Sequence, residues 1–153
     1  MATYFSSQTT IEAKVRSSRV KIWGDKNADG VLDPTTLDQA LAFAKSMILA
    51  MIVRRYGQQA LTWTFDTCPP LLKAVSDDLT LYYLAAGANA LNPVIDINYK
   101  NAVAMLTMVK DYQADVPGVD DTPAIGTTTE ETESVFDDLM LSDTSSIESV
   151  IIR

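Results

Sequence analysis

The stretch DKNADGVLD, residues 25–33, has the residue types and spacing of a calcium-binding loop. Asp25, Asn27 and Asp29 stand at the first, third and fifth positions, where such a loop supplies oxygen ligands, and a glycine follows for the sharp turn. The second half of the pattern fails, because the twelfth position is Thr36 instead of a bidentate Glu. The strongest expected ligand is therefore missing.

The same stretch also has the features of a helix start that needs no metal. Asp33 precedes Pro34, a pair in which the Asp side chain can accept from free backbone N–H groups and Pro fits the first helical position. The Asp, Asn and Gly residues before it are turn formers that bond their own backbone. A metal-free turn is the favoured interpretation, so we assign no metal ligand. A calcium-binding helical protein remains an alternative.

Composition argues against most enzyme chemistry. The chain has no His and a single Cys, Cys68, so imidazole proton transfer, a Cys/His pair and an internal disulfide are excluded. A lone thiol without a nearby His is usually a small apolar filler. Asp77 and Asp78 are neighbours on a predicted helix and point about 100° apart, which favours a solvated face. We expect no catalytic residue, no cofactor and no enzymatic activity.

Length and hydropathy suit one small domain with a real core. The 153 residues are 47% hydrophobic and 21% charged. The longest apolar run, residues 47–53, is far shorter than a membrane span, and the first ten residues lack the basic and apolar parts of a signal peptide. The expectation is a soluble protein made in the cytoplasm.

Charge is distributed unevenly along the chain. Residues 1–114 carry 11 Lys/Arg and 10 Asp/Glu, whereas residues 115–153 carry 1 and 10, so the net charges are +1 and −9. The acidic part repels nucleic-acid phosphates. The nearly neutral part has no basic cluster with interleaved aromatics beyond Arg54, Arg55 and Tyr56. Sequence-specific binding of DNA is therefore not expected.

Apolar spacing predicts about four helices joined by short connections. Thr-x-x-Glu at residues 9–12 has capping-box spacing, and residues 61–65 alternate apolar side chains with Thr, which predicts an extended connector over residues 58–69. Apolar residues elsewhere repeat at steps of four and three. The first expected helix begins near Thr9, and the second runs from Pro34 to about Tyr56, with Gly57 as its stop. The third runs from Pro69-Pro70 to Gly87, and the fourth follows the turn ANALNP and extends to about Tyr112.

Beyond Asp115 the composition becomes acidic and polar. VPGVDDTPAIGTTTEETE is too polar to fold alone, whereas VFDDLML and SVIIR are short apolar stretches within the same acidic region, which favours docking segments. The sequence thus predicts an all-α domain over residues 1–116, a small bundle of about four helices with an extended connector, followed by a long acidic tail over residues 117–153. The expected partner-docking residues are Val135, Phe136, Leu139 and Leu141.

The order of these parts carries a family resemblance over about residues 8–116. The turn DKNADGVLD leads into a long helix that closes with VRRYG, PPLLKAVSDDLTLYYLAAG opens the next helix with Pro-Pro, and INYKNAVAMLTMVKDY contains the last one. This order resembles the small helical head–tail connector or adaptor proteins of tailed bacteriophages, especially those of Mu-type phages. The chain departs from the pattern at SSRVKIW, which replaces a more acidic segment.

The resemblance implies a structural component of the virion without catalytic residues. Its copies would form a ring under the portal, with the symmetry of the portal, and would extend the DNA channel and join the head to the neck or tail. The implied partners are other copies, the portal protein and the downstream neck or tail protein, while DNA passes without sequence-specific contacts. The implied location is the head–tail junction, after assembly in the host cytoplasm. A generic helical protein-interaction module is the main alternative.

Overall fold

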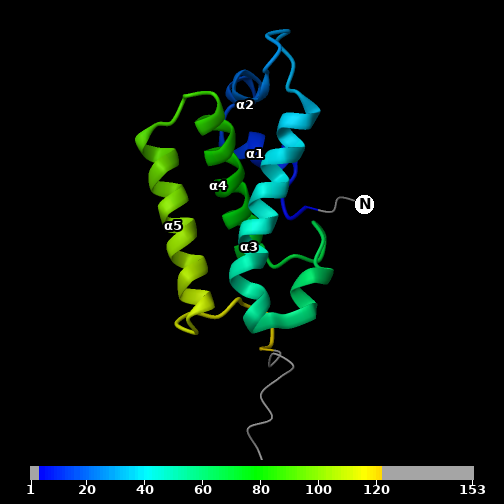
Figure 1. Cartoon of the computed structure of the whole chain (residues 1–153), viewed down its shortest axis with the longest axis vertical. Coiled ribbons are helices and arrows are strands. Elements are labelled where there is room, and N and C mark those ends of the chain that lie inside the picture. Colours follow the sequence, from blue (N-terminus) through cyan, green and yellow to red (C-terminus); the bar gives the residue numbers. More distant parts are fainter. Residues whose placement is uncertain (1–3, 122–153) are drawn as a thin grey trace, which may run out of the picture.

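The computed structural model describes residues 4–121, which form five α-helices and no strand. The all-α prediction is confirmed, with five helices in place of about four. Three long helices run side by side (Figure 1). The two short helices, which come first in the chain, both pack against the second of these long helices. The helices are α1 (Gln8–Lys14), α2 (Ser17–Gly24), α3 (Pro34–Thr62), α4 (Pro70–Gly87) and α5 (Pro93–Lys110).

Helix α1 begins with a capping box, but not at the predicted residues. Ser7 is the N-cap: its Oγ accepts from Thr10 N at 3.3 Å, and Thr10 Oγ1 accepts from Ser7 N at 3.1 Å. Glu12 instead accepts from Gln8 Nε2 on the exposed face. The helix starts here because Phe5, fully buried just upstream, fixes the chain before Ser7. The predicted Thr9–Glu12 box is therefore wrong, although the short helix exists.

Helix α2 is formed by SSRVKIWG, which sequence reasoning missed. It has no capping side chain at Arg16. Its stability comes from burial of Val20 and Trp23, three residues apart, against α4. Gly24 is the last residue of the helix. No larger residue fits at this position without a shift of its neighbours, because a Cβ there would lie 2.0 Å from the side chain of Leu32. Tertiary packing thus determines this element.

Helix α3 breaks at Gly57 as predicted, but it does not stop there. Gly57 has φ 57° and ψ −142°, a backbone conformation that favours glycine. Helix then resumes through Thr62, so the prediction of an extended connector over residues 58–69 is wrong for its first five residues. The short helical piece persists because Ala60 and then Trp63 are buried in the core.

Among the described residues, α3 is the one helix long and apolar enough to cross a membrane by length and composition. Core helices pass the same test. One face of α3 is buried in the body of this protein, through the side chains of Ala40, Ala44, Ile48, Ile52 and Tyr56 among others.

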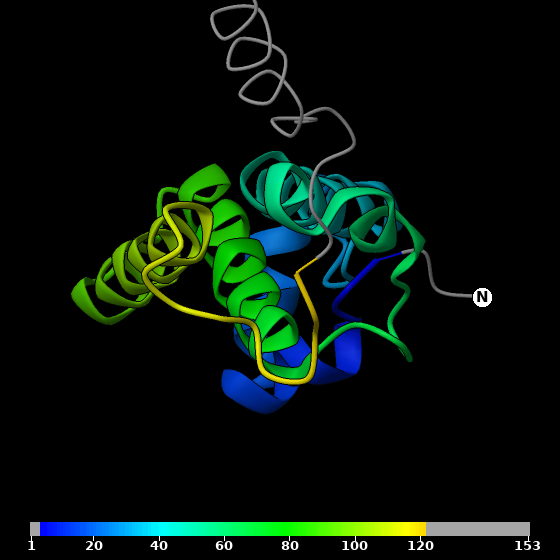
Figure 2. The same cartoon turned by 90° about the horizontal axis from the view of Figure 1, so that it is seen from below.

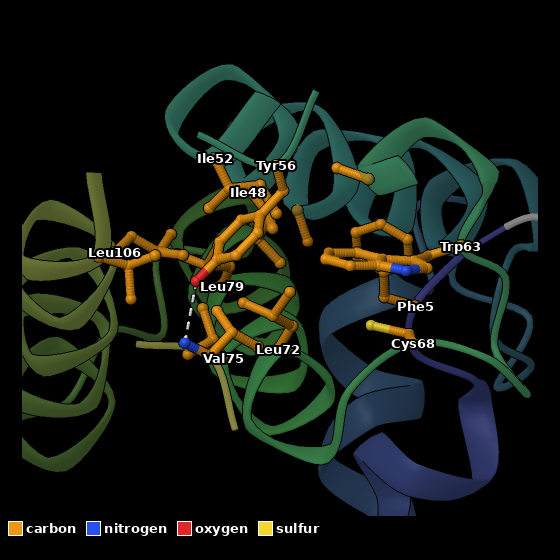
Figure 3. Close-up of a cluster of buried hydrophobic side chains, with 14 of the residues drawn as sticks. Phe5, Ile48, Ile52, Tyr56, Trp63, Cys68, Leu72, Val75, Leu79 and Leu106 are labelled. Atoms are coloured by element: carbon orange, nitrogen blue, oxygen red, sulfur yellow. Dashed lines mark hydrogen bonds between the residues drawn. The ribbon is translucent and has the colours of Figure 1, made fainter. Parts of the chain in front are cut away.

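The main core lies between α3, α4 and α5 (Figure 3). The predicted faces of α4 and α5 point into it, since Leu72 and Leu79 of α4 and Leu106 of α5 are fully buried. A second cluster joins α1 and α2 to the beginning of α3 and the end of α4. Its buried members include Ile11, Val20, Trp23, Leu41 and Leu84.

The Asp77–Asp78 pair does not form a solvated face, contrary to the prediction. Asp77 is only 7% exposed, and its carboxylate accepts from Thr10 Oγ1 at 2.8 Å. Asp78 pairs with Lys14 Nζ at 2.8 Å. Both contacts come from α1, which covers this side of α4. The apolar spacing within α4 does not indicate that α1 packs over the two Asp residues. The prediction failed because this contact joins two helices that are distant in sequence.

Candidate functional site

The Asp-rich turn is held together by bonds from its carboxylates to its own backbone. The carboxylate of Asp25 accepts from the N–H groups of Asp29 at 3.1 Å and Gly30 at 2.7 Å, and Asp29 accepts from Val31 N at 2.8 Å. Among residues 4–121, no group of three or more His, Cys, Asp or Glu side chains is arranged to hold a metal ion. The bonding pattern favours the interpretation as a turn.

The start of α3 is only partly as predicted. Asp33 is the N-cap and Pro34 takes the first helical position. The Asp33 side chain, however, makes no capping bond to α3 and accepts from Lys26 N at 2.8 Å. The Asp33 side chain therefore stabilises the turn and does not cap α3, so the predicted capping bond is wrong.

We expect Asp25→Ala to destabilise the protein by about 1 kcal/mol, because it removes two backbone hydrogen bonds in an exposed turn. Asp29→Ala, which loses one such bond, should cost less. Addition of calcium or of a chelator should leave the melting temperature unchanged. Calorimetry of the three proteins with and without calcium checks this. A calcium-dependent rise that Asp25→Ala abolishes would identify a metal site.

Cys68 lies in the core beside Phe5 and Trp63 (Figure 3). It is 3% exposed, and burial raises the pKa of its thiol to about 12 from an ordinary 9.0. The thiol is therefore protonated and shielded at neutral pH, as expected for an apolar filler.

We expect Cys68 to react with thiol reagents only after unfolding. Its folded pKa lies above the unfolded one, so its contribution to stability is complete below pH 9 and is lost as the pH rises toward 12. The difference in unfolding free energy between the native protein and Cys68→Ala should shrink over this range. Denaturation by urea at several pH values measures it. Rapid labelling of the folded protein at pH 7 would contradict the prediction.

Arg55 of α3 is a buried cation that holds the chain after α5. The side chain is 4% exposed, and Nη1 donates to the carbonyl of Val109 at 3.0 Å and to that of Ala114 at 2.5 Å. Nε and Nη2 donate to the two oxygens of Asp121 at 2.7 and 3.1 Å, and Nη2 also donates to Asp115. One guanidinium thus connects Val109, in the last turn of α5, with three residues of the segment that follows α5.

The charge of Arg55 is stabilised despite burial. The hydrogen bond with Asp121 raises the pKa of Arg55 above its ordinary value, while burial acts in the opposite direction. The guanidinium carbon lies 4.8 Å from the ring centre of Tyr112 and 5.2 Å from that of Tyr56, which adds cation–π attraction. Asp115 is 81% exposed and Asp121 49%, so both carboxylates also contact water.

Tyr56, the next residue, fixes the same segment from inside the core. Its hydroxyl accepts from Val116 N at 3.0 Å, and Val116 is 1% exposed (Figure 3). The segment crosses the end of the bundle from α5 past α4 toward α3 (Figure 2). We call residues 111–121 the C-terminal strap and the pair Arg55–Tyr56 its clamp.

Sequence reasoning missed the clamp because it treated Arg54, Arg55 and Tyr56 as one basic–aromatic cluster. The structure separates them, since Arg54 is exposed and Arg55 is buried. A usable signal was present: Arg55 lies seven residues after Ile48 and three after Ile52, on the buried stripe of α3. A cation on such a stripe needs partners, and acidic residues occur at 115, 120 and 121.

The predicted docking residues are not tested by this geometry. Val135, Phe136, Leu139 and Leu141 lie outside the described residues, which end at Asp121. Their role stays a prediction.

Comparison with known proteins identifies the family. The family model described as "Bacteriophage Mu, Gp36" matches residues 4–135, a range that includes all five helices, the clamp and the strap. No curated protein matches the chain. The resemblance to a Mu-type phage protein is thereby confirmed at the level of the family. The chain, whose residues 4–121 form five helices and a clamped C-terminal strap, belongs to the bacteriophage Mu Gp36 family.

Proposed function

We propose that this protein is a head–tail adaptor of a phage particle, with copies forming a ring beneath the portal. The observation that carries the proposal is the match to the phage Mu Gp36 family over residues 4–135, which suggests a structural or morphogenetic role. The ring would extend the DNA channel and join the head to the neck or tail. Its partners would be other copies, the portal protein and the next neck or tail protein.

The clamp supports a role in assembly over one in catalysis. It uses a buried cation to fix eleven residues of chain after the last described helix, from Asp111 to Asp121. The strap gives a firm starting point from which a further 32 residues, 122–153, can reach a neighbour. We accordingly propose no enzymatic activity and no cofactor.

Charge supports passage of DNA without sequence-specific binding. The chain carries a formal net charge of −8 and has no His. Negative charge near a channel keeps DNA from adhering to its wall. The location that we propose, the head–tail junction of the virion, requires this property.

Deletion of the gene from the phage genome tests the proposal. We expect DNA-filled heads and separate tails in electron micrographs, and rescue of joined particles by the native gene supplied in trans. The protein should also be present in purified virions, in a ring at the junction. A generic interaction module or assembly factor would be absent from the mature particle. Normal joined particles without the protein, or its absence from virions, would overturn the proposal.

A further inference from the structure

A groove with a volume of about 650 Å³ lies between the α1–α2 junction and the beginning of α5. Lys14, Arg16 and Arg19 supply the cations of its lining. Val15, Pro93 and Val94 are among its apolar residues. We call it the basic groove. Cations and apolar side chains together are the lining that an acidic peptide with large apolar residues would fit.

Two of the three cations have no counter-charge among residues 4–121. Lys14 is engaged, because its Nζ contacts Asp78 and the carbonyl of Ala74. Arg16 and Arg19 are exposed, and neither side chain forms an ion pair or hydrogen bond with a residue in the range 4–121. Val94 beside them is 65% exposed. These side chains contribute little to the fold, which leaves them available for a partner.

We infer that the basic groove binds the segment VFDDLML, residues 135–141, of a neighbouring copy. The segment carries two adjacent carboxylates, Asp137 and Asp138, between apolar pairs, which matches two free guanidinium groups next to an apolar wall. Arginine and carboxylate form charge-assisted bonds that fix the register of a peptide. The 115–153 region has a net charge of −9, so attraction to the groove also extends over the whole tail.

The proposed ring favours a neighbouring copy as the source of the segment. The strap begins at the C-terminal end of α5 (Figure 1). The groove is lined by residues at the N-terminal end of the same helix. A helix of 18 residues places these two ends about 27 Å apart. Residues 122–134, 13 in number, span at most about 45 Å when extended, which is long enough to reach the groove of a neighbouring copy or of the same chain. A donor site and an acceptor site at opposite ends give a head-to-tail contact, which forms a ring where the rotation between successive copies closes and an open filament where it does not. This step rests on the proposed function.

A peptide fits the groove better than nucleic acid does. Phosphates would satisfy Arg16 and Arg19 but would leave the exposed apolar side chains of Pro93 and Val94 uncovered. The side chains of Phe136 and Leu139 can cover them. Duplex DNA is therefore included as a competitor in the test below.

Disulfide trapping between two full-length copies tests the inference. One copy carries Val94→Cys, and the other carries Leu139→Cys with a tag that changes its size. The native Cys68 can stay, because it is buried. We expect a cross-linked heterodimer under mild oxidation. Ala104→Cys is the matched control: it is exposed on the same helix about 15 Å farther along and should give little product.

Charge exchange separates specific docking from random collision. Arg16→Glu with Arg19→Glu should lower the yield of heterodimer about tenfold, because like charges then face each other. Asp137→Lys with Asp138→Lys in the other copy should restore it. Both groove positions are exposed, so circular dichroism should show an unchanged fold. Failure of the exchange to restore the yield would overturn the assigned contact.

The remaining outcomes each decide the question. Cross-linking only within a single chain that carries both cysteines, at all protein concentrations, would show that the groove takes its own segment and would overturn docking between copies. No cross-link in either arrangement would overturn the inference altogether. Suppression by duplex DNA but not by a synthetic VFDDLML peptide would indicate a nucleic-acid site. Because this readout needs no phage, it can succeed or fail independently of the gene deletion.

Discussion

Replacing Arg55 with Ala is expected to lower the free energy of unfolding by about 2 to 4 kcal/mol. The change removes charged hydrogen bonds to the carbonyls of Val109 and Ala114 and opens a cavity at a site that is 4% exposed. The loss is smaller than for a fully buried ion pair, because Asp115 and Asp121 already contact water and can be hydrated. Urea denaturation followed by circular dichroism measures it.

Arg54→Ala is the matched control for this prediction. Arg54 is the preceding residue and is exposed, so its removal should change stability by no more than about 0.5 kcal/mol. Arg55→Lys should fall between the two, since an ammonium keeps the charge but cannot donate to the carbonyls and to Asp121 at once. Equal effects at residues 54 and 55 would show that the clamp does not stabilise the fold.

Local signals decided which parts of the fold could be predicted from the sequence. Helix α4 was predicted with its observed end at Gly87 because the signals are local: a Pro-Pro start, a regular apolar face and a terminal glycine. Helix α5 and the break at Gly57 were predictable for the same reason. Each of these features is encoded within one turn of the residues concerned.

Three of the errors, at α2, Asp77 and Arg55, share a different cause. Helix α2 is held by packing of Val20 and Trp23 on α4, and Asp77 is buried because α1 covers it. Arg55 is buried because the chain returns to it from 54 to 66 residues away. These are contacts between segments distant in sequence, which periodicity within one helix does not report. A cation on an apolar stripe is the exception, since its position alone indicates that a partner must exist.

The second large effect is expected from shortening the chain within the strap. A protein ending at Gln113 should unfold with a free energy lower by about 3 to 5 kcal/mol than one ending at Asp121. The shorter chain loses burial of Val116, the bond from Val116 N to the Tyr56 hydroxyl, and three of the four residues that Arg55 contacts. Comparison of two truncated proteins cancels any contribution from residues 122–153.

Hydrogen exchange distinguishes the clamp from a general loss of packing. In the chain ending at Asp121, the N–H of Val116 should be protected, because it donates to a buried hydroxyl. Tyr56→Phe in that chain should remove this protection while leaving amides in the middle of α4 protected, since the phenyl ring still fills the core. If the two truncated proteins are equally stable, the strap does not belong to the folded body. The Arg55 side chain would then satisfy its charge without the residues after Gln113.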